Sequence, residues 1–497
     1  MLYRQGFDTF IRIFDEVGYI VSKKDFTDRV TDSSGAVFLS ALTREARNFD
    51  DIVADISRYF SDVDETQLKR DVKQFYAILE RDGFIVSGKT EKEIDRKDKR
   101  FSYSAIMPKT IKSDFTPLFN RATKKTQIIL EDRFKDKPHL MAFQIELTSR
   151  CNERCVHCYI PHQKKTTDIS DDLFYYTLDQ YRKMGGLNLT LSGGEPLMHP
   201  HFCEYLHKAK EYDFAVNVLS NLTLLNDDIV EIMKNIRLSS VQVSLYSMLP
   251  ETHDSITTIP GSFKKTLRSI ETLVKNDIPL QISCPILKQN KNNYVDVLKY
   301  AKRIKVRAVT DYIIMARYDQ TTDNLENRLN LDDIAKVISN NIENDFIYQM
   351  KIRSTNFNVA DNIDKSNDIV CGVCISSLGM VANGNIYPCA GWQSCILGNI
   401  LEQPLNEIWL NSPKVKYLRS LRKKDFSQCN GCPDKSFCAM CMVRNANENI
   451  EGDPLKINEH FCKVANINRK IVMEYKKMKT PKIFWKLAGI DNSGKQI

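Results

Sequence analysis

Between residues 140 and 315, short apolar runs alternate with segments whose apolar residues recur at helical spacing. This alternation predicts a parallel sheet built from βα units. The strand-like runs are 141–147, 187–192, 214–220, 240–246, 279–285 and 307–313. In such folds the functional site lies at the carboxyl ends of the strands, on the βα loops. Side chains that directly follow these runs are therefore the first candidates for chemistry.

Residues 1–90 show a different pattern. Short β-like runs at 9–14 and 19–22 precede helical patterns at 33–42, 49–60 and 65–83. In the third of these, apolar residues fall on one helical face, namely Leu68, Val72, Phe75, Ile78 and Leu79. Gly83 ends that pattern, and a short strand follows at 84–88. The pattern predicts a small α/β unit with a winged-helix outline.

The remaining segments differ in composition. We expect a charged linker at 91–139, the βα core at 140–320 and a helical connector at 321–369. A cysteine-rich, irregular domain follows at 370–465, and a basic helical tail occupies 466–497. The chain therefore divides into an N-terminal unit, a central α/β core and a C-terminal cysteine-rich domain.

Composition narrows the function classes. The chain has 497 residues, of which 42% are hydrophobic and 27% charged, as in ordinary globular proteins. Its apolar runs are all shorter than the roughly 18 residues of a membrane helix, and its start has no apolar signal core. The net charge is only +8, which gives no reason to expect a nucleic acid. We expect a cytoplasmic protein with neither membrane nor nucleic-acid partners.

The 14 cysteines are the most informative feature. In a reducing compartment, clustered cysteines hold metal more often than they form disulfides. Cys151, Cys155 and Cys158 share one loop after the first core strand. Three thiolates can hold three irons of a [4Fe–4S] cluster and leave the fourth iron open to a substrate. A zinc or purely structural site is the alternative.

The spacing Cys-x3-Cys-x2-Cys, followed by Tyr159, resembles the radical S-adenosylmethionine (radical SAM) superfamily, although His157 stands where an aromatic residue is commoner. The resemblance implies a partial (β/α)6 TIM-type barrel. It also implies that SAM binds the open iron and is cleaved to a 5′-deoxyadenosyl radical. Related enzymes often have an aspartate where this chain has Tyr246. The residues that the resemblance assigns to SAM are Tyr159, Gly193, Gly194, Glu195, Ser220, Asn221 and Ser244.

The C-terminal cysteines are similar to the SPASM domain of radical SAM enzymes that act on peptides, except that two residues rather than three separate Cys438 from Cys441. The resemblance implies two auxiliary [4Fe–4S] clusters. The first would be held by Cys371, Cys374, Cys389 and Cys441, and the second by Cys429, Cys432, Cys438 and Cys462. Cys203 and Cys284 fit buried free thiols. Cys395 lies near the first set and could replace a ligand, and a missing ligand there would leave an iron open to a substrate thiolate. A zinc ribbon is the alternative.

The N-terminal unit resembles the PqqD-like peptide-binding domain, also called the RiPP recognition element, of enzymes that modify ribosomally made peptides. The resemblance implies that a leader peptide adds as a strand to a sheet edge beside the third helix. Candidate contacts are 19–22, 29–31, Lys69, Lys73 and Tyr76. A DNA-binding winged helix is the alternative, and the mixed charges of the third helix disfavour it.

Together these resemblances imply an α/β radical SAM/SPASM maturase that joins residues of a precursor peptide. A thioether is favoured, and a carbon–carbon or carbon–oxygen bond comes next. The cofactors would be three [4Fe–4S] clusters and SAM, and the electron donor would be a flavodoxin or ferredoxin. The alternatives are a formylglycine-forming sulfatase maturase and a zinc-containing winged-helix regulator. The sequence does not identify the precursor, the residues joined or the oligomeric state.

Overall fold

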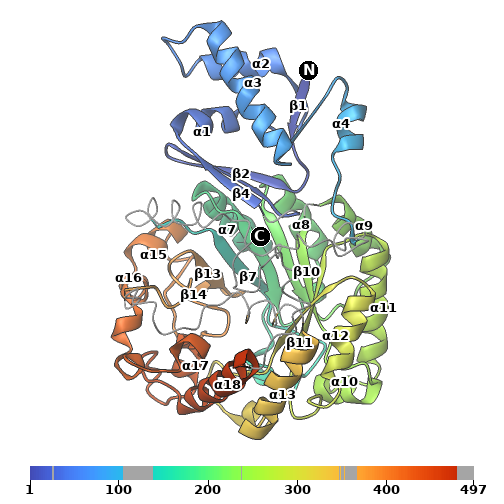
Figure 1. Ribbon diagram of the computed structural model, residues 1–497, viewed down its shortest axis with the longest axis vertical. Coiled ribbons are helices and arrows are strands. Elements are labelled where there is room, and N and C mark those ends of the chain that lie inside the picture. The colour runs from blue at the N-terminus through green and yellow to red at the C-terminus, as the bar shows by residue number, and fades with distance from the viewer. Residues whose placement is uncertain are drawn as a thin grey trace.

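A computed structural model describes residues 1–24, 27–103, 138–236, 238–345, 348, 352 and 367–477. The end of the predicted tail, most of the predicted linker and much of the predicted connector lie outside the described residues. Figure 1 shows a large α/β body with a smaller N-terminal unit above it.

The body is organised around one nine-stranded sheet in the order β12-β11-β10-β9-β8-β7-β13-β14-β15. Strands β7 to β13 run parallel where they pair, and β14 and β15 are antiparallel additions at one edge. The core strands are β7 (Ala142–Thr148), β8 (Asn188–Gly193), β9 (Ala215–Ser220), β10 (Leu238–Ser244), β11 (Leu280–Pro285) and β12 (Arg307–Asp311). The predicted α/β class and all six predicted strands are confirmed.

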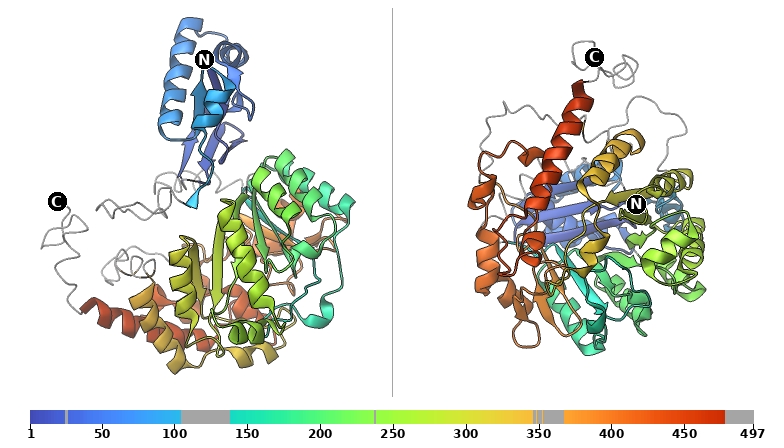
Figure 2. Two further views of the ribbon diagram at one scale, coloured as in Figure 1. Left: turned by 90° about the vertical axis from the view of Figure 1, so that its right-hand side faces the viewer. Right: turned by 90° about the horizontal axis from the view of Figure 1, so that it is seen from below.

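Helices connect the core strands and cover the outer face of the sheet (Figure 2). Alternate strand residues, such as Phe143, Ile145 and Leu147, are buried in a core shared with these helices. Polar N-caps begin several of the helices, as where Ser170 accepts a hydrogen bond from Leu173 N. The covering helices are α7 (Asp171–Lys183), α8 (Phe202–Glu211), α9 (Asp227–Asn235), α10 (Pro250–Thr257), α11 (Ser262–Lys275), α12 (Tyr294–Arg303) and α13 (Leu331–Asn344).

The cysteine-rich segment joins this sheet. Its strand β13 pairs in parallel with β7, so the segment lies directly beside the first core strand. Its elements are β13 (Ser377–Met380), β14 (Asn385–Tyr387), β15 (Gly398–Asn399), α15 (Leu405–Asn411), α16 (Pro413–Ser420), α17 (Met442–Asn447) and α18 (Glu459–Lys477). None of the helices in the described ranges is both long and apolar enough to cross a membrane.

The N-terminal unit contains two small sheets and a helical layer. One sheet has the order β2-β3-β4 and the other β5-β1-β6. The elements are β1 (Leu2–Gln5), β2 (Thr9–Phe14), β3 (Val17–Ser22), β4 (Thr27–Thr31), α1 (Ser33–Ser40), β5 (Arg47–Asn48), α2 (Phe49–Ser57), α3 (Glu65–Arg81), β6 (Ile85–Gly88) and α4 (Glu91–Lys97). The apolar face of α3 differs from the prediction, because Tyr76 is fully buried whereas Ile78 is 41% exposed.

The N-terminal unit packs against the amino-terminal ends of the core strands (Figures 1 and 2). Phe10 and Phe14 of β2 share an apolar cluster with Leu187 and Ala215, which lie at the beginnings of β8 and β9. At this interface Arg12 is buried, and its guanidinium donates hydrogen bonds to the carbonyl oxygens of Gly186 and Asp213 at 2.8 and 2.7 Å.

Candidate active site

The loop that carries Cys151, Cys155 and Cys158 follows β7 directly, at the carboxyl end of the sheet. Burial, the Glu153 carboxylate and the other two thiols raise the pKa of Cys155 well above its ordinary value. The three thiols therefore lie near one another, and each of the three cysteines is only partly exposed. Loss of the thiol proton there requires a cation, because an unpaired buried thiolate is costly.

Glu195 connects the cysteine loop to the neighbouring strands through hydrogen bonds. Its side chain is fully buried and accepts hydrogen bonds from Ser220 Oγ and Asn221 N, both at 2.7 Å. Asn221 in turn donates to Asn152 Oδ1 of the cysteine loop at 2.9 Å. The loops after β7, β8 and β9 thus form one bonded unit. Burial raises the pKa of Glu195 to about 7.

The two glycines before Glu195 allow close packing against the cysteine loop. Gly193 has a φ of +146°, and a Cβ there would lie 2.1 Å from the Thr148 carbonyl oxygen. A Cβ on Gly194 would lie 2.3 Å from the Arg150 carbonyl oxygen. Both positions therefore require glycine. Their contact with SAM stays a prediction.

Ser244 and Tyr246 lie on the β10 side of the site. The Tyr246 hydroxyl donates a weak hydrogen bond to Cys155 Sγ at 3.8 Å, and its ring contacts His157 edge-on. Ser244 hydrogen-bonds to the same hydroxyl, which brings this predicted residue beside the cysteine loop. Tyr159 continues the loop, and its carbonyl oxygen accepts a hydrogen bond from Tyr318 N at 3.0 Å.

A buried carboxylate, Glu146, was missed by the sequence reasoning. It lies on β7 and is 4% exposed, and burial raises its pKa to about 7. Gln393, from the segment after β14, donates a hydrogen bond to Glu146 Oε1 at 2.9 Å. The available signal was an acidic residue inside a predicted core strand.

The C-terminal cysteines form two neighbourhoods. Burial raises the pKa of Cys389, and the nearby thiols of Cys441 and Cys371 raise it further. Burial raises the pKa of Cys438 to about 11, with further contributions from the other three predicted ligands of the second auxiliary cluster, Cys462, Cys429 and Cys432. The structure thus brings together that second set and three members of the first.

Cys374, the fourth member of the first set, is fully buried in the core. Burial raises the pKa of its thiol to about 12, an effect that Arg419 opposes and that Cys395 and Cys371 increase. Cys284 is buried, as predicted for a free thiol, whereas Cys203 is only partly buried. Within the described ranges, no three His, Cys, Asp or Glu side chains converge as ligands of a single metal ion do. A [4Fe–4S] cluster binds its cysteines through separate irons, so its thiols need not converge on one point.

The predicted leader contacts differ in accessibility. Strand β3, which contains 19–22, is paired on both sides, whereas β4 pairs only with β3 among the described strands. Tyr76 is buried, and its hydroxyl donates to the Phe38 carbonyl oxygen, so it is unavailable to a peptide. The prediction was therefore wrong for strand addition at 19–22 and for a peptide contact by Tyr76, whereas β4 has a free edge as far as the described strands show.

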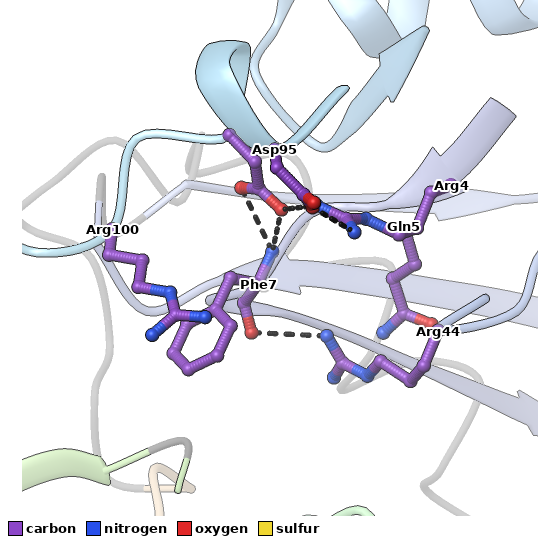
Figure 3. Close-up of a pocket in the computed structure, with 7 residues that line it drawn as sticks. Arg4, Gln5, Phe7, Arg44, Asp95 and Arg100 are labelled. Atoms are coloured by element: carbon purple, nitrogen blue, oxygen red, sulfur yellow. Dashed lines mark hydrogen bonds and ion pairs between the residues drawn. The ribbon is translucent and has the colours of Figure 1, made fainter. Parts of the chain in front are cut away.

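A hollow of about 330 Å³ also lies in the N-terminal unit, beside α4 (Figure 3). Arg4 forms ion pairs with Asp95 and Asp98, both at 2.7 Å, and the Arg100 guanidinium lies over the Phe7 ring. The charged side chains that line this hollow are thus largely paired with one another. The remaining lining residues are Gln5 and Arg44.

Comparison with known proteins agrees with this geometry. Residues 145–301 match the radical SAM superfamily, and residues 371–433 match the SPASM iron–sulfur cluster-binding domain. The AdoMet-dependent heme synthase of Methanosarcina barkeri is 28% identical over 333 residues, covering 62% of this chain and 92% of that protein. The subtilosin biosynthesis protein AlbA of Bacillus subtilis is 26% identical over 350 residues, covering 67% and 73%.

Among solved structures, Streptococcus suis SuiB bound to the precursor peptide SuiA has the same fold, with a TM-score of 0.61 and 15% identity. That match covers 93% of this chain and all of SuiB, and so extends beyond the two matched domains. The radical SAM domain binds SAM and a [4Fe–4S] cluster, and the SPASM domain binds auxiliary iron–sulfur clusters. The soft, closely spaced thiols after β7 fit such a cluster. The chain therefore contains, over 145–301, a region that matches the radical SAM superfamily, followed over 371–433 by a region that matches the SPASM iron–sulfur cluster-binding domain.

Proposed function

We propose that this chain modifies a ribosomally made precursor peptide by radical chemistry. The observation that carries the proposal is the bonded unit in which Glu195 joins three strand-end loops around Cys151, Cys155 and Cys158. Cys151, Cys155 and Cys158 would hold the cluster, which together with SAM would supply the 5′-deoxyadenosyl radical chemistry that removes hydrogen from carbon. The chain's own residues hold the cysteine loop, exclude water from it and orient the substrate.

The proposed SAM contacts follow from the same loops. The backbone of Gly193 and Gly194, together with Ser220, Asn221, Ser244 and Tyr159, would surround SAM beside the cysteine loop. Because both oxygens of Glu195 already accept hydrogen bonds within the protein, its main role in this proposal is to position the loops. The second auxiliary cluster would be held by Cys429, Cys432, Cys438 and Cys462.

A peptide substrate is supported by two kinds of comparison. AlbA is a bacteriocin biosynthesis protein, and the SuiB structure contains a precursor peptide. The SuiB match spans nearly the whole chain. We propose that the N-terminal unit is a leader-recognition element and that the leader adds to the open edge of β4. Arg29, on β4, forms an ion pair with Asp82 just beyond α3 at 3.1 Å, which places this edge near the end of α3.

A cross-link is the proposed product, with a thioether favoured over a carbon–carbon or carbon–oxygen bond. An auxiliary cluster would accept the electron that ring closure releases, and a flavodoxin or ferredoxin would supply the electron that starts the reaction. Heme synthases are also among the relatives, so a porphyrin substrate is the second candidate and must be tested beside peptides.

The test uses the full chain after anaerobic reconstitution with iron and sulfide. Random-sequence peptides displayed on mRNA are selected against it, and the enriched peptides are incubated with chain, SAM and dithionite. We expect several of them to increase 5′-deoxyadenosine formation and to lose two hydrogen atoms, as mass spectrometry would show. A Cys155→Ala variant should form neither product. Turnover of Fe-coproporphyrin III without any response to peptides would contradict the proposal.

A further inference from the structure

The second half of the cysteine loop is held by one distant segment, residues 315–328, which follows β12 and is called the bridging segment below. Each backbone carbonyl oxygen of residues 156–160 accepts a hydrogen bond from this segment. The bonds run from Asn327 Nδ2 to Val156 O at 3.1 Å, from Asn324 Nδ2 to His157 O at 3.3 Å, from Arg317 Nη1 to Cys158 O at 3.1 Å and to Ile160 O at 3.4 Å, and from Tyr318 N to Tyr159 O at 3.0 Å.

Arg317 brings a positive charge to this contact. Its side chain is 9% exposed, whereas that of Asp323, which accepts two hydrogen bonds from the guanidinium at 2.7 and 2.8 Å, is 66% exposed. The positive end of the ion pair therefore faces the cysteine loop, and the negative end faces solvent. A positive charge beside an iron–sulfur cluster stabilises the reduced, more negative state of the cluster and raises its reduction potential.

The bridging segment is also attached to the cysteine-rich domain. Gln320 Nε2 donates hydrogen bonds to the carbonyl oxygens of Ala446 and Asn449, at 3.3 and 3.0 Å. Arg328 forms an ion pair with Glu448, and both side chains are largely buried. The segment is thus fixed to the end of α17 by groups that are separate from those that hold the cysteine loop.

Helix α17 and its surroundings carry two predicted ligands of the first auxiliary cluster. The helix begins directly after Cys441. Near its end, Asn447 Nδ2 donates to Ala316 O of the bridging segment at 3.4 Å and to Gly391 O at 2.8 Å, and Gly391 lies two residues after Cys389. One segment therefore joins the loop of the first cysteine group to the backbone around the second.

We propose that the bridging segment positions the cysteine loop for its cluster, with Arg317 as the positioning residue and the cysteine-rich domain as the anchor. Three thiolates can bind one cluster only when the backbone between them is held in a suitable geometry, and partners outside the ligand loop supply that restraint. The inference rests on the proposed binding of a cluster by Cys151, Cys155 and Cys158. It is independent of the class of substrate.

The first experiment compares two replacements of Arg317 in the full chain, reconstituted anaerobically with iron and sulfide and kept without substrate. Arg317→Met removes the donors and the charge, whereas Arg317→Lys keeps the charge. The readout is the reduction potential of the cluster whose electron paramagnetic resonance signal responds to SAM. For Arg317→Met we expect a lower potential and about tenfold slower SAM cleavage, and for Arg317→Lys a potential close to that of the wild type. Arg4→Met, at a partly buried arginine that pairs with Asp95 and Asp98, is the matched control.

The second experiment tests the anchor by hydrogen exchange over residues 151–160. Gln320→Met keeps the side-chain volume and removes the donors to Ala446 and Asn449. Exchange over 151–160 should become faster, because the bridging segment is then less firmly held. Asn235→Leu is the control, since its amide bonds to a backbone carbonyl oxygen within α9.

Iron content and circular dichroism are measured for each variant. Loss of about four iron atoms from a folded Arg317→Met variant, but not from Arg4→Met, would also support the inference. A wild-type potential in Arg317→Met, or unchanged exchange over 151–160 in Gln320→Met, overturns it. If the wild-type chain forms no cluster that responds to SAM, the proposed function fails as well. If it forms one and modifies no peptide, the proposed function fails and this inference stands.

Discussion

At the scale of single residues, Glu146 links the core to the cysteine-rich segment and makes stability depend on pH. Burial raises its folded-state pKa from the ordinary 4.5 to about 7, so the folded chain binds this proton more tightly than the unfolded chain does. The stabilising contribution is full below about pH 4.5 and is lost as the pH rises through 7. Glu146→Gln should therefore flatten the fall in melting temperature between pH 5 and pH 8. An equally steep fall in the variant would show that the group stays charged when folded.

Gly193 permits a second prediction at this scale. An added Cβ would lie 2.1 Å from a backbone oxygen that cannot move away easily. Gly193→Ala should therefore displace the cysteine loop, with loss of SAM binding and of the iron held there. Gly261→Ala is the matched control, since Gly261 also has a positive φ, +82°, but nothing lies within 4 Å of its Cβ position. That variant carries only the backbone strain, about 1–2 kcal/mol. Equal iron content in the two variants would contradict the steric argument.

Sequence alone predicted the residues that carry local motifs. The cysteines, Gly193, Gly194 and Glu195 are each recognisable from near neighbours in the chain. The hydrogen bond between Glu146 and Gln393 joins residues 247 positions apart, so no local sequence pattern predicts it. The buried state of Tyr76 was missed for a similar reason. Its hydrogen-bond partner, the Phe38 carbonyl oxygen, belongs to another helix. Spacing alone does not show which of two neighbouring aromatic residues on α3 is the more deeply buried.

At the scale of elements, the pattern of apolar residues predicted all six core strands. In strands such as β8, β10 and β11, buried apolar residues largely alternate with partly exposed polar ones, which is the pattern of a strand with one buried face. The short strands β1 and β4 were not predicted. They contain Arg4 and Arg29, whose charges pair with acidic residues near the ends of distant elements. The position of β13 beside β7 could also not be predicted from the sequence. Parallel pairing between segments more than 200 residues apart depends on the arrangement of the whole sheet.

The contact between β2 and the core strands gives a prediction at this scale. Arg12 is 2% exposed and bonds to two carbonyl oxygens of the core. Arg12→Met leaves those oxygens without their partner, at a cost of about 2–4 kcal/mol. Hydrogen exchange in β2, β3 and β4 should become faster, while exchange in β7 to β11 changes little. Arg58→Ala, at an exposed arginine of the same unit, should leave both rates as they are. Unchanged exchange in the Arg12 variant would show that apolar packing alone holds the unit.

At the scale of the whole molecule, the N-terminal unit and the cysteine loop lie at opposite ends of the core strands. The unit packs at the beginnings of β8 and β9, and the cysteine loop follows the end of β7. A strand of six residues, such as β8, spans about 20 Å. A leader bound to β4, as proposed, must therefore be followed by enough chain to reach the carboxyl ends of the core strands.

The metal content of the whole chain tests the division of its cysteines. Three four-iron clusters require about 12 iron atoms per chain after anaerobic reconstitution. Replacing Cys155 should remove about four of these, because an incomplete three-cysteine loop cannot hold its cluster, and replacing Cys432 should remove about four from the C-terminal set. Cys203→Ser is the control, because that partly buried thiol belongs to neither neighbourhood. About four iron atoms with zinc in the remaining sites would leave the radical SAM centre in place. It would also remove the auxiliary electron acceptors, and with them the cross-linking reaction.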